Sequence, residues 1–126
     1  MHELGIAEAV LDAVRSEAAR HGDVRVHKVG VKIGELAGLD CEAFRFCFEA
    51  IARDTEFESL ILEIEHCPRR QRCSNCQQEF VVKEHDLHCP SCGRVYGECI
   101  GGNELDLSYL EVGEHATSGV GAESIE

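Results

Sequence analysis

The spacing of apolar residues predicts two helices in the first half of the chain. In one stripe, apolar residues recur at intervals of three and four, which is typical of a helix over residues 4–20: Leu4, Ala7, Leu11, Val14 and Ala18. Gly22 follows it and can take the left-handed backbone that ends a helix. A second stripe predicts a helix over 41–53: Phe44, Cys47, Phe48 and Ile51. Asp40 precedes this helix and is a good N-cap, because its carboxylate can accept hydrogen bonds from the first turn.

Alternation of apolar and polar residues predicts three strands. The first spans 24–34, where the alternation changes phase, so we expect a β-bulge near His27 and Lys28. The second spans 59–66 and has Leu60, Leu62 and Ile64 on one face. In the third, near the end of the chain, an apolar set alternates with Asp106 and Ser108: Leu105, Leu107 and Tyr109.

Residues 67–103 interrupt this pattern. They carry six of the eight cysteines and both prolines, with few aliphatic residues. We interpret them as a module inserted before the last strand, which returns to the first domain. The chain then divides into a first domain, 1–66 plus 104–112, the insertion 67–103, and a tail. The tail, 113–126, is rich in Gly, Ser, Ala and Glu, and we expect it to be disordered.

Charge and leader signals narrow the class of protein. The 126 residues carry a formal charge of −12, from 24 acidic and 12 basic side chains. Such a surface repels phosphate backbones and anionic lipid, which disfavours nucleic acid and membranes and favours cations and basic protein surfaces as partners. The start of the chain lacks the basic and apolar regions of a signal peptide, and no apolar run reaches the roughly 20 residues of a membrane helix. We therefore expect a cytoplasmic protein, in which cysteines indicate metal binding rather than disulfides.

Two C-x-x-C pairs lie in the insertion, Cys73 with Cys76 and Cys89 with Cys92, and twelve residues separate them. Each pair can turn back so that both sulfurs reach one ion about 2.3 Å away, and four thiolates suit a closed, structural zinc site. A segment of about 37 residues buries too little apolar surface to fold alone, so the metal would drive its folding.

Other roles for the cysteines stay open. The two pairs also fit a redox dithiol or a disulfide, and His85 or His88 could replace a thiolate in a catalytic zinc site. We interpret Cys67 and Cys99, which flank the module, as buried residues at its hinge. Gln77 follows the first pair where many zinc knuckles have glycine.

The N-terminus offers a second group of metal ligands. His2 is bulky, so we expect Met1 to be retained with its primary amine. This amine, the imidazole of His2 and the intervening amide nitrogens can close fused chelate rings, which suit Ni(II) or Cu(II). A helix begins here, so its first N–H groups have no intrahelical acceptor to lose. The alternative is a solvated His2 followed by Glu3, an acidic residue that a helix dipole favours.

Taken together, these parts resemble the HypA/HybF family of hydrogenase-maturation nickel metallochaperones. The resemblance covers the chain to about residue 112. It rests on five features in this order: Met1-His2-Glu3, Val31-Lys32-Ile33-Gly34-Glu35, the Phe44 to Phe48 helix, the two C-x-x-C pairs and Gly102-Asn103-Glu104-Leu105. It implies an α+β fold, with two helices packed on a three-stranded sheet as the nickel-binding domain and an inserted zinc-ribbon module.

The resemblance also implies ligands, metals and partners. His2 would be the principal nickel ligand, with Glu3 needed nearby and Asp40 as a further carboxylate. Ni(II) would be the transported cargo and Zn(II) a structural ion. The protein would not be an enzyme. The partners would be a HypB-type nickel GTPase, the large subunit of [NiFe]-hydrogenase and, in some organisms, urease accessory proteins, while a homodimer is left open.

Two questions remain at this point. Four cysteines lie outside the family's metal motif, and we assign them structural roles: Cys41, Cys47, Cys67 and Cys99. The main competing hypothesis is a zinc-ribbon protein–protein adaptor with no nickel role, which explains the C-x-x-C pairs but not the position of His2.

Overall fold

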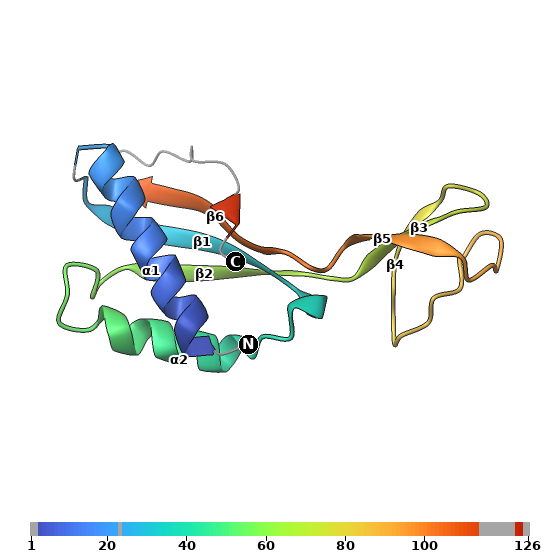
Figure 1. Cartoon of the computed structure of the whole chain (residues 1–126), viewed down its shortest axis with the longest axis horizontal. Coiled ribbons are helices and arrows are strands. Elements are labelled where there is room, and N and C mark those ends of the chain that lie inside the picture. The colour runs from blue at the N-terminus through green and yellow to red at the C-terminus, as the bar shows by residue number, and fades with distance from the viewer. Residues whose placement is uncertain (1–2, 23, 114–122, 125–126) are drawn as a thin grey trace.

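The computed structural model describes residues 3–22, 24–113 and 123–124. It shows an elongated molecule with a sheet at each end (Figure 1). Two helices and the sheet β2–β1–β6 form one end, called here the α/β part, and the sheet β4–β3–β5 forms the other, called here the cysteine part. This arrangement confirms the predicted α+β fold, with two helices, a three-stranded sheet and a separate cysteine-bearing sheet.

Helices α1 (Glu3–Arg20) and α2 (Cys41–Ala52) form where the apolar stripes predicted them. Their buried residues share one core with the sheet, and the largest fully buried side chains include Phe44 and Phe48 of α2. Asp40 is the N-cap of α2, because its Oδ1 accepts hydrogen bonds from the backbone N–H groups of Glu42 and Ala43, both at 3.1 Å. Gly22 follows α1 with a φ of 83°, as the capping argument predicted.

Strand β1 (Val26–Gly34) is the central strand of the α/β part. It pairs in parallel with β2 (Ile61–Cys67) and antiparallel with β6 (Leu105–Val112). A two-residue strand, β7 (Glu123–Ser124), pairs with the outer edge of β6. The pairing of β1 with β6 shifts between Val26 and Lys28, which confirms the bulge predicted there.

A second shift between β1 and β6 contradicts the simple alternation expected for the last strand. Leu105, Leu107 and Leu110 are buried, whereas Tyr109 lies opposite Gly30. A side chain at Gly30 would place its Cβ 1.9 Å from the Tyr109 ring, so glycine leaves the space that the ring occupies. Tyr109 therefore does not share the core face of Leu105 and Leu107, because a bulge reverses the order of faces. Burial and a hydrogen bond to Glu63 raise the pKa of Tyr109 to about 12.

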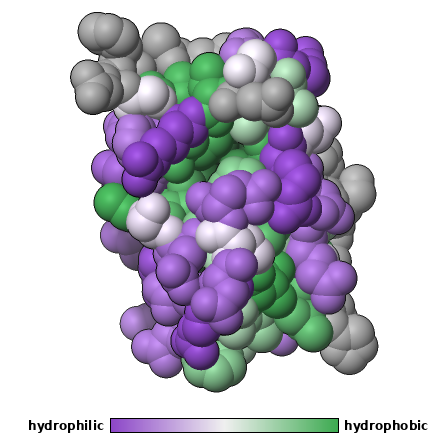
Figure 2. Space-filling model, turned by 90° about the vertical axis from the view of Figure 1, so that its left-hand side faces the viewer, coloured by the Kyte–Doolittle hydropathy of each residue, from purple (hydrophilic) through white to green (hydrophobic). Residues whose placement is uncertain are grey.

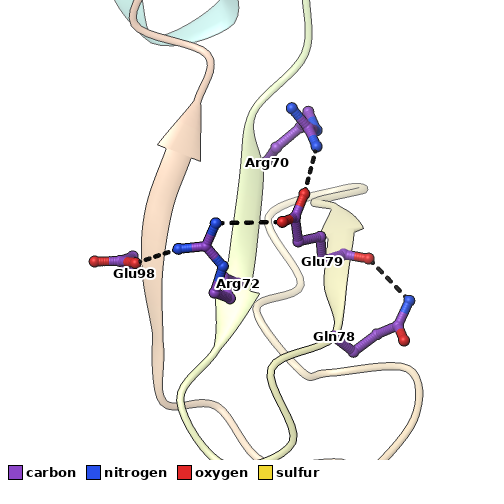
Figure 3. A network of polar contacts seen from close by, with 5 residues as sticks. All are labelled: Arg70, Arg72, Gln78, Glu79 and Glu98. Atoms are coloured by element: carbon purple, nitrogen blue, oxygen red, sulfur yellow. Dashed lines mark hydrogen bonds and ion pairs between the residues drawn. The ribbon is translucent and has the colours of Figure 1, made fainter.

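The cysteine part is built from three short strands. Strand β3 (Arg70–Cys73) lies between β4 (Glu79–Val81) and β5 (Gly97–Gly101), antiparallel to both. Figure 3 shows Arg72 reaching Glu98 on one neighbouring strand, at 2.8 Å, and Glu79 on the other, at 3.2 Å. Arg70 also contacts Glu79, at 2.9 Å. These ion pairs are exposed to solvent, which screens them, so each contributes little to stability.

Two chain segments join the parts, and the 3₁₀ helix η1 (Glu35–Ala37) binds to one of them. The N–H of Leu36 donates to the carbonyl of Gly102 at 2.6 Å, and the N–H of Gly34 donates to that of Glu104 at 2.7 Å. A Cβ at Gly34 would lie 2.1 Å from the Gly102 oxygen, so this approach of two backbones requires glycine. We call this region the hinge.

The opposite end of the α/β part faces the viewer in Figure 2, where apolar surface shows between polar side chains. A cavity of about 360 Å³ lies at this end, and its lining includes Arg15, Ala18, Val26 and Phe57. Neither helix of the described residues is long and apolar enough to cross a membrane.

Candidate metal sites

Four cysteines converge at the tip of the cysteine part. Cys73 ends β3 and Cys76 follows in the next turn, while Cys89 and Cys92 come from the long connection between β4 and β5. Their sulfurs all lie within 4.8 Å of one another, and no other group of three or more His, Cys, Asp or Glu side chains converges in this way in the described part of the chain. The structure therefore brings together the four residues that the two C-x-x-C pairs singled out.

The two pairs are held by matching turns. The N–H of Gln77 donates to the carbonyl of Cys73 at 2.9 Å, and the N–H of Gly93 donates to the carbonyl of Cys89 at 2.8 Å. Both donors have positive φ, 65° at Gln77 and 78° at Gly93. Glycine takes this left-handed backbone readily at Gly93, and Gln77 adopts the same turn without glycine.

The sulfur positions fit a tetrahedral ion. The Sγ atoms of Cys73 and Cys92 are 3.5 Å apart, and those of Cys76 and Cys89 are 3.6 Å apart. Ligands at zinc–sulfur distance from a common centre would be separated by about 3.8 Å. Hydrogen bonding from the Arg94 backbone and the neighbouring thiol of Cys73 lowers the pKa of Cys92 to about 6, so the site favours a thiolate there.

The structure gives less support to the other roles considered for the histidines and the flanking cysteines of this part. His88 is paired with Asp86, with Nδ1 and Oδ1 2.7 Å apart, and neither it nor His85 joins the sulfur cluster. Cys67 is half-buried at the end of β2, and Cys99 is exposed in β5. The interpretation of Cys99 as a buried hinge residue is therefore wrong, because its strand lies at an edge of a thin sheet.

Of the expected nickel ligands, Met1 and His2 lie outside the described residues. Glu3 begins α1, and its Oε2 accepts a hydrogen bond from the backbone N–H of Asp40 at 3.1 Å. This bond lowers the pKa of the Glu3 carboxyl below its ordinary value. The structure thus joins the beginning of α1 to the beginning of α2, two positions that lie far apart in the sequence.

Another contact lies beside this junction. Cys41, the first residue of α2, has its Sγ 3.7 Å from Nδ1 of His66 in β2. Sequence reasoning missed this pair, since it assigned Cys41 a structural role and did not discuss His66. The only available signal was weak: each residue bears a metal-binding group and lies at the end of an element.

Comparison with known proteins supports the same interpretation. Residues 1–112 match the family model for HypA, described as hydrogenase/urease nickel incorporation, metallochaperone. The chain belongs to the HypA family. Proteins of this family are non-catalytic metallochaperones, so the chain serves nickel incorporation in hydrogenase or urease maturation and is not an enzyme.

Members of the HypA family are similar to this chain over nearly their whole length. The hydrogenase maturation factor HypA of Geotalea daltonii is 44% identical over 112 residues, which are 89% of this chain and 99% of the relative. That of Geobacter metallireducens is 39% identical over the same share. The solution structure of the Ni metallochaperone HypA from Helicobacter pylori is 27% identical, with a TM-score of 0.58, covering 93% of this chain and all of that one. A second HypA solution structure is also 27% identical, with a TM-score of 0.63 and a coverage of 89% of this chain and 96% of that one.

Proposed function

We propose that this protein binds Ni(II) as cargo at its N-terminus and releases it during [NiFe]-hydrogenase maturation, or urease maturation. The ligands are the amine of Met1, the imidazole of His2 and the amide nitrogens between them. Nitrogen ligands in a small chelate at the chain terminus can be exchanged one at a time, which suits delivery. A closed cage of four thiolates holds its ion too completely to pass it on.

The contact between Glu3 and Asp40 is the observation that carries this proposal. Because His2 is bonded to Glu3, their Cα atoms are about 3.8 Å apart, so the ligands begin one residue from this contact. Glu3 and Asp40 bring two carboxylates to the same place, which raises the local attraction for a cation. Oδ1 of Asp40 already accepts both N-cap bonds, so a ligand role for Asp40 falls to its Oδ2.

The four cysteines of the tip are proposed to hold Zn(II) as a structural ion. Their sulfur distances suit that ion, and zinc would cross-link the two matching turns of the cysteine part. We also propose the domain division as 1–66 plus 104–112 for nickel binding and 67–103 for zinc. Of the two hinge hydrogen bonds, the one from Leu36 to Gly102 would then join the domains, whereas Gly34 and Glu104 both lie in the nickel-binding domain.

The proposed partners are a HypB-type nickel GTPase, the hydrogenase large subunit and, for urease, its accessory proteins. The formal charge of −12 favours basic surfaces on these partners. We place these encounters in the cytoplasm, where the eight free thiols stay reduced.

Calorimetry with Ni(II) tests the proposal on zinc-loaded protein whose N-terminus carries no tag. His2→Ala should abolish the high-affinity nickel site. The matched control is His27→Ala, since His27 is an exposed residue of β1. Nickel affinity that is the same in both variants would refute the N-terminal site and favour the zinc-ribbon adaptor.

Glu3→Gln tests the supporting carboxylate. The pKa of Glu3 is lowered in the folded protein, so its contribution to stability is present above its unfolded pKa, about 4.3, and is lost as the pH falls through the lower folded value. At neutral pH, Glu3→Gln should therefore have a lower free energy of unfolding than the wild type. Its free energy of unfolding should also fall less as the pH is lowered through this range. Glu8→Gln, an exposed position of the same helix, is the control and should match the wild type.

A further inference from the structure

A cavity of about 310 Å³ opens at the hinge, beside the beginning of α2. Four segments line it: the end of β1, η1 with its following turn, the first residue of α2 and the end of β2. Its metal-binding side chains are Glu35, Cys41, His66 and Cys67. The cavity is therefore formed by the tertiary structure, because its lining residues run from Ile33 to Pro68, which are 35 positions apart in the sequence.

Within this cavity the thiol of Cys41 and the imidazole of His66 face each other, with Sγ and Nδ1 3.7 Å apart. A thiolate about 2.3 Å and an imidazole about 2.0 Å from one tetrahedral ion would be separated by about 3.5 Å. The observed 3.7 Å is close to this separation, so the two atoms are spaced to share one ion. Cys41 is half-buried and His66 is exposed, so a cation can reach the pair from solvent.

The position of this pair relates it to the N-terminus. The backbone N–H of Asp40 donates to Glu3, and Cys41 is the next residue along the chain. An ion released by the residues before Glu3 would thus find the sulfur of Cys41 one residue after the Glu3–Asp40 contact, together with the imidazole of His66. Two protein ligands leave the other coordination positions to water or to an incoming ligand, unlike the closed set at the cysteine tip.

We propose that Cys41 and His66 form a second metal site, which binds a borderline-soft divalent cation such as Ni(II) through one thiolate and one imidazole, independently of His2. As a site that receives nickel from the N-terminus, it rests on the proposed function. As a binding site, it stands on the geometry of the cavity alone.

The test is a titration of full-length, untagged, zinc-loaded protein with Ni(II), under a phosphine reductant, followed by absorption and calorimetry. Zinc occupies the four cysteines of the tip, so a thiolate-to-nickel charge-transfer band reports on sulfur elsewhere. The wild type should develop this band, saturating at one equivalent per chain for the sulfur site. In His2→Ala the band should persist, and calorimetry should show one nickel equivalent fewer than in the wild type.

Two variants test whether Cys41 supplies the sulfur ligand and His66 the nitrogen ligand. Cys41→Ser should abolish the band, and His66→Ala should weaken the affinity measured from the band about tenfold or more. Cys47→Ser is the matched control, because Cys47 is a half-buried cysteine of the same helix that does not line the cavity, and it should keep the band. His66 is exposed, so His66→Ala provides a variant whose fold should be intact, which circular dichroism and zinc content verify.

Three results would overturn the proposal: no charge-transfer band in the wild type, a band that Cys41→Ser and His66→Ala leave unchanged, or a band that disappears in His2→Ala. The last would mean one composite site rather than two. If only the N-terminal site is wrong, the wild type and His2→Ala should bind the same number of nickel ions, and both should show the band.

Discussion

The α/β part and the cysteine part differ in what fills their interiors. The core of the α/β part is one cluster of apolar side chains from both helices and all three main strands. In residues 70–100 the buried positions are few, and half are cysteines: Gln71, Cys73, Val82 and Cys89. Several large apolar side chains there are exposed: Val81, Val95 and, at 70%, Tyr96. The α/β part can thus fold by burying apolar surface, whereas the cysteine part buries little and would depend on the metal proposed at its four cysteines.

The largest effect should come from removing a metal ligand. Cys73→Ala should lose stoichiometric zinc and the dispersed amide resonances of residues 70–101, because structural zinc supplies on the order of 10 kcal/mol to such modules. The resonances of α1, β1 and α2 should stay. Cys99→Ala, an exposed cysteine of the same sheet outside the sulfur cluster, should keep both zinc and resonances. Zinc content like that of the wild type in Cys73→Ala would contradict the ligand assignment.

The converse experiment acts on the apolar core. Phe44 is 0% exposed, so Phe44→Ala should lower the free energy of unfolding of the α/β part by about 3–5 kcal/mol, measured by urea denaturation. Zinc content should not change if the two parts fold independently. Phe46 lies on the same helix but is 72% exposed, so Phe46→Ala should change stability by less than about 0.5 kcal/mol. Equal losses in the two variants would argue against the core as described.

A substitution at the hinge tests how tightly the parts are joined. Gly34→Ala would force the new Cβ against the Gly102 carbonyl, a backbone atom that cannot rotate away, and should cost about 1–3 kcal/mol in thermal or urea denaturation. Gly5→Ala is the opposite case, since no atom lies within 4 Å of its Cβ position in α1. It should stabilise the protein by about 0.5–1 kcal/mol. A neutral Gly34→Ala would show that the hinge backbones separate easily.

The smallest effect is expected from the surface ion pairs of the cysteine part. Arg72→Ala removes contacts with Glu79 and Glu98 on both neighbouring strands (Figure 3), yet it should lower stability only slightly, because solvent screens these charges. A double-mutant cycle with Glu98→Ala measures the coupling, which should shrink as salt is added. A strong coupling that added salt does not reduce would show that ion pairs help to hold this sheet together.

Local signals predicted the two helices and the three main strands of the α/β part. The apolar stripes placed α1 and α2, and Asp40 was identified as an N-cap because capping depends on residues only two or three positions away. The Cys73 to Cys92 spacing predicted the sulfur cluster for the same reason, since each C-x-x-C turn is closed by its own backbone. The face of Tyr109 was not predictable in this way, because it depends on a register shift against β1.

The amino-acid sequence alone determined the two helices, the three main strands of the α/β part, the four-cysteine motif and the resemblance to nickel metallochaperones, because these depend on residue type and short spacing. Only the tertiary structure placed Glu3 against Asp40 and Cys41 against His66. Those contacts join chain segments separated by 37 and 25 positions, so the packing of helices on the sheet decides them.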